Sequence, residues 1–315
     1  MSQLNIAYFG APQFSARVLE RIILELKELV TVKSVFTQPD KKAGRRQILT
    51  PTPVKLLAQK HNVPVYEELP LTTNDQRLST VDLVLLYAYG KMVPPYILKM
   101  PKWGFWNIHP SLLPLYRGAS PLAYSLFMGD KTAGVSLMEM DERMDHGPIL
   151  RRQQYEIKNE DTREDLENRL SDIGYELFKQ SIRLLIDGTL QKEEQNHKNR
   201  TFTRLLTKQD GFIPLSIVQK IIKGEIPKND EIPSIITEYS QKYSLIDNHK
   251  PLIAYYALYR GLSPWPGLWT RISGDKRLKI TGMELKNNML IITKVQLEGK
   301  KEVDFETFNT AYKIF

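Results

Sequence analysis

The chain has 315 residues, of which 42% are hydrophobic and 25% charged, and no cysteine; this excludes disordered, collagen-like and coiled-coil proteins, disulfide frameworks, thiolate zinc sites and cysteine nucleophiles. Lys and Arg outnumber Asp and Glu by 44 to 36, a net charge of +8 that permits an RNA or phosphate-rich partner. No apolar run approaches the roughly 18 to 20 residues that cross a bilayer, and the first residues do not resemble a signal peptide, so we expect a cytoplasmic protein of two domains.

Strands and helices alternate along the first half of the chain. An apolar run at 4–9, stopped by Gly10 and followed by helical spacing at 14–26, predicts a strand, a turn and a helix. Further elements are expected as strands at 32–36, 63–66, 81–89 and 103–108 and as a short helix at 54–60. This alternation predicts a Rossmann-like, doubly wound α/β domain, whose ligand crevice lies at the carboxyl ends of its strands.

The second half changes character after a long helix. Strands are expected at 133–140 and 149–157, and the amphipathic stretch 162–185 predicts a helix that closes the first domain. A helix is also expected at 216–223, and alternating runs at 278–283, 289–297 and 305–314 predict a small OB-like β-barrel. We therefore expect a catalytic domain at 1–188, a polar linker at 189–208 and a barrel domain at 209–315.

Polar side chains gather where two of these strands end. Asn107 and His109 stand two residues apart at the end of a strand, so they point to the same side. The polar turn 140–148 could bring carboxylates to the same crevice, where an Asp beside an imidazole favours the charged ring and makes a proton shuttle. The alternatives are a histidine satisfied in a loop, a solvated Gly-Pro hairpin, and a metal site of His109, His146 and Asp145, which we disfavour because an Asn is a poor ligand.

Four segments together resemble the 10-formyltetrahydrofolate-dependent formyltransferases: Asn107-Ile108-His109, Ser111–Pro114, Tyr116–Gly118 and Asp145–Gly147. The resemblance covers most of residues 4–301. It implies transfer of a formyl group from N10 of the folate to an amine, with no metal and no covalent enzyme intermediate. It makes Asn107, His109 and Asp145 the catalytic residues. It assigns folate binding to Ser111, Leu112, Leu113, Pro114, Tyr87, Ala88, Tyr89, Gly90 and Asp141.

Two basic zones bear on which amine is formylated. The loop carrying Lys41, Lys42, Arg45 and Arg46 resembles the loop of the methionyl-tRNA formyltransferase branch, which reaches into the tRNA acceptor end, and its cations could neutralise phosphates. A solvated charged loop is the alternative. In the second domain nine basic residues follow from 260 to 301, and a Pro-Trp-Pro-Gly segment resembles the head of that branch's barrel, with Trp265 expected as a packing anchor.

The resemblance therefore favours formylation of the α-amine of methionyl initiator tRNA, which serves translation initiation. A formyltransferase for an amino sugar or another small amine would share the catalytic residues but leave the basic loop and the barrel idle, and a non-catalytic RNA-binding protein is a further alternative. We expect a monomer with no obligate protein partner and no membrane. Residues 213–250 depart from the common pattern, and His146 replaces the small or polar residue that often follows the catalytic Asp.

Overall fold

A computed structural model describes residues 3–43, 47–244 and 250–315. The chain divides into two compact units, which are not contiguous in sequence. Unit 1 comprises 1–117, 134–155 and 167–202, and unit 2 comprises 118–133, 156–166 and 203–315. The domain boundaries expected at 188 and 208 stay a prediction. Among the described residues, no helix is both long and apolar enough to cross a membrane.

Unit 1 is built on one seven-stranded sheet, in the order β10-β9-β7-β6-β1-β2-β5. Its strands are β1 (Leu4–Gly10), β2 (Val30–Phe36), β5 (Val65–Tyr66), β6 (Leu83–Tyr87), β7 (Phe105–His109), β9 (Thr132–Glu139) and β10 (Ile149–Glu156). The strands from β5 to β7 are parallel, and β9 pairs antiparallel with β7. Because β1 lies between β2 and β6, the winding reverses there, as the predicted doubly wound α/β class requires.

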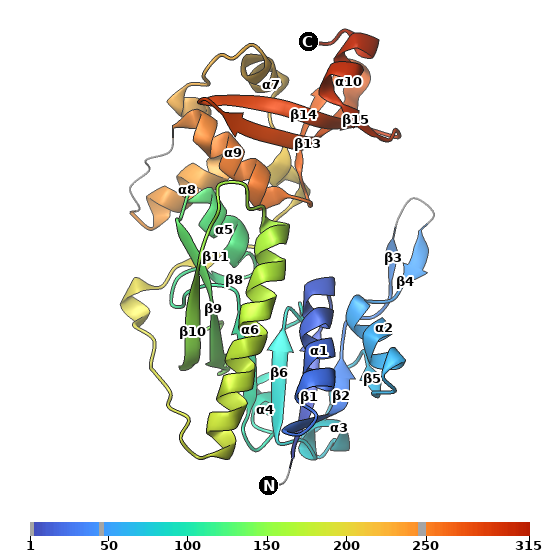
Figure 1. The fold of residues 1–315 in the computed structure, drawn as a ribbon, viewed down its shortest axis with the longest axis vertical. Coiled ribbons are helices and arrows are strands. Elements are labelled where there is room, and N and C mark those ends of the chain that lie inside the picture. The colour runs from blue at the N-terminus through green and yellow to red at the C-terminus, as the bar shows by residue number, and fades with distance from the viewer. Residues whose placement is uncertain (1–2, 44–46, 245–249) are drawn as a thin grey trace. The chain divides into compact units, whose positions relative to one another are not determined.

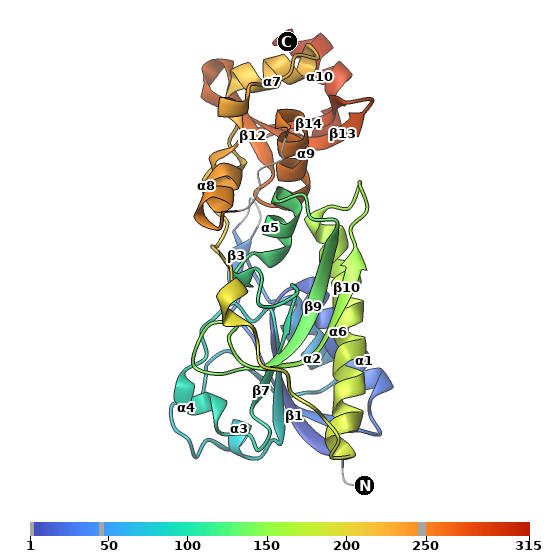
Figure 2. The ribbon, with the colours of Figure 1, turned by 90° about the vertical axis from the view of Figure 1, so that its left-hand side faces the viewer.

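Helices cover both faces of this sheet (Figures 1 and 2). They are α1 (Gln13–Glu25), α2 (Pro53–Lys60), α3 (Gln76–Ser79), α4 (Pro95–Leu98) and α6 (Arg163–Ile186). Helices α1 and α6 lie side by side on one face, joined by ion pairs of Arg21 with Asp172 and Glu176. The other face packs on α3 and α4 through a cluster that includes Phe9 and Phe105.

Unit 2 contains an antiparallel sheet in the order β12-β13-β14-β15, formed by Leu268–Ile272, Lys276–Lys286, Met289–Leu297 and Glu302–Asp304. Its helices are α5 (Pro121–Phe127), α7 (Leu215–Ile222), α8 (Ser234–Lys242), α9 (Pro251–Leu262) and α10 (Phe305–Tyr312). The expected small antiparallel domain is therefore present. The short strands β8 (Arg117–Gly118) and β11 (Phe202–Thr203) form a separate pair where the chain passes between the units, and β3 (Lys41–Ala43) and β4 (Ile48–Thr50) form a hairpin in unit 1.

The last element differs from its prediction. Residues 305–314 were expected to continue the strands, but 305–312 form α10. Phe308 and Tyr312, four residues apart, stack with their ring centroids 4.8 Å apart on one helix face. Phe308 is fully buried. The short apolar run fits the spacing of a strand or of a helix, and burial of one aromatic side chain of the stacked pair favours the helix.

The packing behind β7 generates a test of stability. In α6, a Cβ added at Gly174 would lie 2.6 Å from Cγ2 of Ile108, the residue between Asn107 and His109. Alanine is favoured over glycine inside a helix by about 1 kcal/mol, but overpacking costs about 1 to 3 kcal/mol. We expect Gly174→Ala to lower the free energy of unfolding in urea by up to about 2 kcal/mol.

The background Ile108→Ala supplies the control, because it removes the atoms that crowd position 174. In that background Gly174→Ala should raise the free energy of unfolding. The same sign in both backgrounds would show that the contact does not set the packing distance between α6 and β7.

Candidate active site

Asn107 and His109 lie on the face of β7 that points away from α6. The intervening side chains show this: the Trp106 ring contacts Phe178 of α6 edge-on at 6.3 Å between centroids, and Ile108 packs on α6 as well. Since neighbouring side chains on a strand point to opposite faces, Asn107 and His109 share the other face. Both are buried, with 8% and 4% of their surface exposed.

The turn between β9 and β10 brings Asp145 to these two residues. Its Oδ1 lies 3.4 Å from Nδ2 of Asn107 and 3.6 Å from Nδ1 of His109. Asp145 has a φ of 48°, in the left-handed region that costs energy for residues other than glycine. The amide, the imidazole and the acid that the sequence singled out therefore converge on one carboxylate oxygen.

The hydrogen bond on the other side of His109 fixes its tautomer. Nε2 lies 3.0 Å from the carbonyl oxygen of Tyr116, and a carbonyl oxygen can only accept, so Nε2 carries a proton. Tyr116 has a φ of 56°, and its own N–H donates to Oγ1 of Thr201 at 2.8 Å. Nδ1, the nitrogen that faces Asp145, is therefore the position where His109 can gain or lose a proton.

Gln195 fixes the turn that carries Asp145. Its Nε2 donates to the backbone oxygens of Asp145 and Gly147, at 2.9 and 2.7 Å, and its Oε1 accepts from Nη2 of Arg117 at 2.6 Å. Both Gln195 and Arg117 are buried, and burial lowers the pKa of the Arg117 guanidinium. Sequence reasoning missed Gln195, because it stands in a polar stretch that reads as a tether.

The segment 111–114, expected to bind folate, is held to β9 by hydrogen bonds. The Oγ of Ser136 donates to the backbone oxygen of Ser111 at 2.8 Å and accepts from the N–H of Leu113 at 3.1 Å. Ser111 and Leu113 are buried, and Leu112 and Pro114 are half-buried. Ser136 is fully buried and was not singled out from the sequence.

The end of β6 contributes backbone. Ala88 and Gly90 have φ values of 53° and 75°, so the chain turns sharply after the strand. Tyr89 packs its ring on Phe9, and burial raises its pKa to about 12. Its backbone oxygen accepts from Nε2 of Gln38 at 2.9 Å, which holds the turn.

Tyr87 differs from its neighbours in the predicted folate set. Its hydroxyl lies 3.0 Å from Oγ of Ser171 on α6, so its side chain lies on the face opposite Asn107. We leave the Tyr87 side chain out of the proposed folate contacts.

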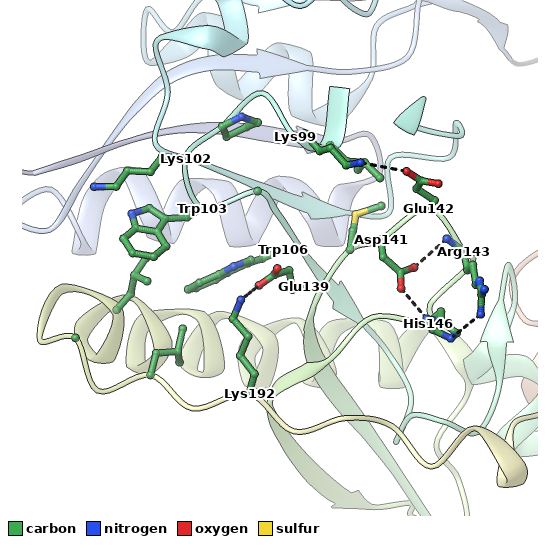
Figure 3. Close-up of a pocket in the computed structure, with 17 residues that line it drawn as sticks. Lys99, Lys102, Trp103, Trp106, Glu139, Asp141, Glu142, Arg143, His146 and Lys192 are labelled. Carbon is green, nitrogen blue, oxygen red and sulfur yellow. Dashed lines mark hydrogen bonds and ion pairs between the residues drawn. The ribbon is translucent and has the colours of Figure 1, made fainter. Parts of the chain in front are cut away.

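The Asp141 carboxylate organises the turn. It accepts from the N–H of Arg143 at 2.9 Å and from Nδ1 of His146 at 2.6 Å. It also borders a cavity of about 1020 Å³ whose lining includes Trp103 and Trp106 (Figure 3). Asn107, His109 and Asp145 do not line this cavity, which follows from Trp106 pointing to the other face of β7.

Within the described part of the chain, no group of three or more His, Asp or Glu side chains is arranged to hold a metal ion. His109 and Asp145 lie together, but His146, the third residue of the alternative metal set, turns to Asp141 instead.

The described start of the basic loop is strand β3, which pairs with β4, and its residues Lys41 and Lys42 are exposed. Lys41 bonds to the side chain of Gln38. Arg45 and Arg46, the other two predicted contacts, lie outside the described residues.

Trp265 does not act as the packing anchor that the sequence suggested, since 52% of it is exposed. Trp269 takes that place: it is 7% exposed and its Nε1 donates to the backbone oxygen of Lys208 at 2.9 Å. The exposed ring and the buried one thus belong to residues only four positions apart in the same segment.

Comparisons with known proteins identify the family of the chain. Residues 4–182 match the family model described as formyl transferase. The chain is 34% identical to a methionyl-tRNA formyltransferase of Alkaliphilus oremlandii, over 95% of this chain and 94% of that protein, and 31% identical to one of Geobacter sulfurreducens, over 100% and 96%. A solved methionyl-tRNA formyltransferase from Clostridium thermocellum matches with a TM-score of 0.59 at 17% identity, over 93% of this chain and 98% of that one, and shows a shared fold.

The Gln195 contacts generate a test. Gln195→Leu keeps the volume but leaves two backbone oxygens without their donor, and each unsatisfied buried group costs about 1 to 3 kcal/mol. We expect the free energy of unfolding to fall by about 3 kcal/mol, with faster hydrogen exchange in the turn 141–147. Gln191→Leu, an exposed position in the same segment, is the matched control; an equal loss there would mean that the contacts of Gln195 are not responsible.

Proposed function

The chain belongs to the methionyl-tRNA formyltransferases, which transfer a formyl group from 10-formyltetrahydrofolate to the α-amine of methionyl initiator tRNA, and we propose that Asn107, His109 and Asp145 carry this reaction. The observation that supports these assignments is the single Asp145 oxygen that lies 3.4 Å from the Asn107 amide and 3.6 Å from the His109 ring. The product, formylmethionyl-tRNA, serves translation initiation.

The three side chains meet the needs of the reaction. As the amine attacks, negative charge develops on the formyl oxygen, and preorganised donors stabilise it most strongly where water is excluded. Asn107 Nδ2 supplies one N–H and His109, protonated on Nδ1, supplies another. Both groups are buried, so their positions do not need to reorganise during the reaction.

Asp145 completes the proton path. Because the Nε2 proton of His109 is held by Tyr116, only Nδ1 exchanges a proton, and it faces the carboxylate. The amine must lose a proton while the folate nitrogen gains one. Asp145 is placed to accept the proton of the amine and to relay it to the folate nitrogen, while its negative charge holds His109 in the protonated form. Separations slightly longer than a normal hydrogen bond are common before substrate binds.

Two backbone segments on the same side of the sheet as Asn107 and His109 are placed to bind the formyl donor. The backbone of Ala88, Tyr89 and Gly90 turns sharply and is held by Gln38, and the loop 111–114 is held by Ser136. We propose that these two segments and the Asp141 turn bind the folate. A cytoplasmic location and a monomeric state also stay proposals.

The tRNA contacts rest on the hairpin. Lys41 and Lys42 are exposed on β3. On β4, Leu49, which pairs with Lys42, and its neighbour Ile48 are each 60% exposed. Cations beside apolar side chains suit a phosphate backbone with an adjacent sugar or base. We propose that this hairpin contacts the acceptor end; contacts by Arg45 and Arg46, which lie outside the described residues, stay a prediction from the sequence.

Asn107→Ala tests the catalytic assignment. Loss of one donor of this kind costs about 100- to 1,000-fold in turnover in other enzymes, and we expect a loss of that order in kcat with a much smaller change in the affinity for the folate. Asn74→Ala, in an exposed loop, should leave kcat unchanged. A parallel loss of folate affinity and kcat would contradict the assignment of Asn107 as an oxyanion donor.

The double variant Lys41→Ala, Lys42→Ala tests the hairpin and separates tRNA from a small amine as substrate. A plot of log affinity against log salt concentration has a negative slope, and each lost phosphate contact makes this slope shallower by about 0.7 to 0.9. We expect tRNA filter binding to weaken and the slope to become shallower by up to about 1.8, while Lys286→Ala, whose lysine pairs with Glu284, should leave the slope in place. A wild-type protein without a steep salt slope would favour an amino-sugar substrate.

A further inference from the structure

Unit 1 holds a second cavity, of about 360 Å³, directly beside the turn that carries Asp145. Three arginines, Arg117, Arg143 and Arg200, line it together with two histidines and two apolar side chains, and no acidic side chain lines it. The catalytic trio does not border it, and the predicted tRNA contacts lie elsewhere, so the reaction described above leaves this basic pocket without a role.

The two histidines are stacked. The rings of His146 and His197 lie 4.0 Å apart and 9° from parallel. His197 Nδ1 faces Nη2 of Arg117 at 2.8 Å, and a guanidinium only donates, so the His197 proton is on Nε2. Among the described residues, no acceptor is found for this Nε2 proton.

Two of the three arginines of the pocket have no acidic partner among the described residues. Neither Arg143 nor Arg200 pairs with an acidic side chain in the described part of the chain; Arg143 Nη1 lies 3.4 Å from the His146 ring and Arg200 Nη1 donates to the backbone of His197 at 2.6 Å. Partial burial and the neighbouring His146 and Arg117 lower the pKa of His197. A bound anion would accept hydrogen bonds from these donors and would offset the repulsion between the neighbouring cations.

One side of the pocket is apolar. Met144 is 49% exposed and Phe202 37% exposed, and the Arg117 guanidinium lies 5.9 Å from the Phe202 ring. Met144 and His146 also flank Asp145 in sequence. A ligand here would place an anionic group among the arginines and an apolar group on Phe202, while its remaining part could reach the catalytic carboxylate.

We propose that this pocket binds the phosphate of the terminal nucleotide of the tRNA acceptor strand, with its sugar or base against Phe202 and Met144. The proposal rests on the proposed function, because the amine that reaches Asp145 is joined through a ribose to that phosphate. Arginine forks match phosphate oxygens, and the His197 Nε2–H adds a further donor.

Two minimal substrates test this: the methionyl ester of adenosine and the methionyl ester of adenosine 5′-phosphate, each with 10-formyltetrahydrofolate. We expect the wild-type KM to be about tenfold lower for the phosphorylated ester, since a hydrogen bond to a charged group is worth roughly that factor. In the double variant Arg143→Ala, Arg200→Ala the two KM values should become equal. Arg152→Ala, whose arginine pairs with Glu193 outside the pocket, should keep the tenfold preference.

A second measurement uses whole methionyl-tRNA. The double variant should raise its KM about tenfold and make the salt slope shallower by about 0.7, the value for one phosphate of a single strand. A wild-type enzyme that does not distinguish the two esters, a double variant that keeps the preference, or an unchanged KM for tRNA would each overturn the proposal. Failure of the wild type to formylate methionyl-tRNA at all is a separate result, which would overturn the proposed function instead.

Discussion

The whole site depends on how the back of β7 is packed. Trp106 against Phe178 and Ile108 against Gly174 fix that strand on α6, and strand alternation then sends Asn107 and His109 to the opposite face. A slip of one residue would exchange the two pairs, placing an amide and an imidazole in the apolar contact with α6 and two large apolar side chains in the site. The chemistry on one face is therefore specified by hydrophobic packing on the other.

The acid that completes the trio is held by a different means. Asp145 sits in a left-handed backbone conformation, which persists only where its surroundings determine it. Gln195 supplies that constraint through two bonds to the turn and one to Arg117. Since Arg117 also contacts His197, one network of hydrogen bonds joins the turn that carries Asp145 to the basic pocket.

Local patterns predicted most of unit 1 and the shared side of Asn107 and His109, because period-two and helical spacing are decided over a few neighbouring positions. The place of Asp145 beside them was expected only from the family resemblance. They did not predict Gln195 or Ser136, whose roles depend on partners far along the chain. They also misassigned 305–314, where a short apolar run fits a strand or a helix equally well and only the buried Phe308 decides. Trp265 and Trp269 make the same point: two tryptophans in one segment, of which packing buries only the second.

Many basic residues of unit 2 already have partners within the protein. Five of the nine basic residues between 260 and 301 are engaged within the protein: Arg260 with backbone oxygens, Arg271, Lys286 and Lys294 with acids, and Lys279 with a backbone oxygen. Burial even lowers the pKa of Lys279 and of Arg260. A cation already satisfied gains less from a phosphate than one that is not, because the old bond must be broken first. By this criterion Arg143 and Arg200, which the net charge did not distinguish, are better placed to bind an RNA phosphate than most of the longer basic stretch.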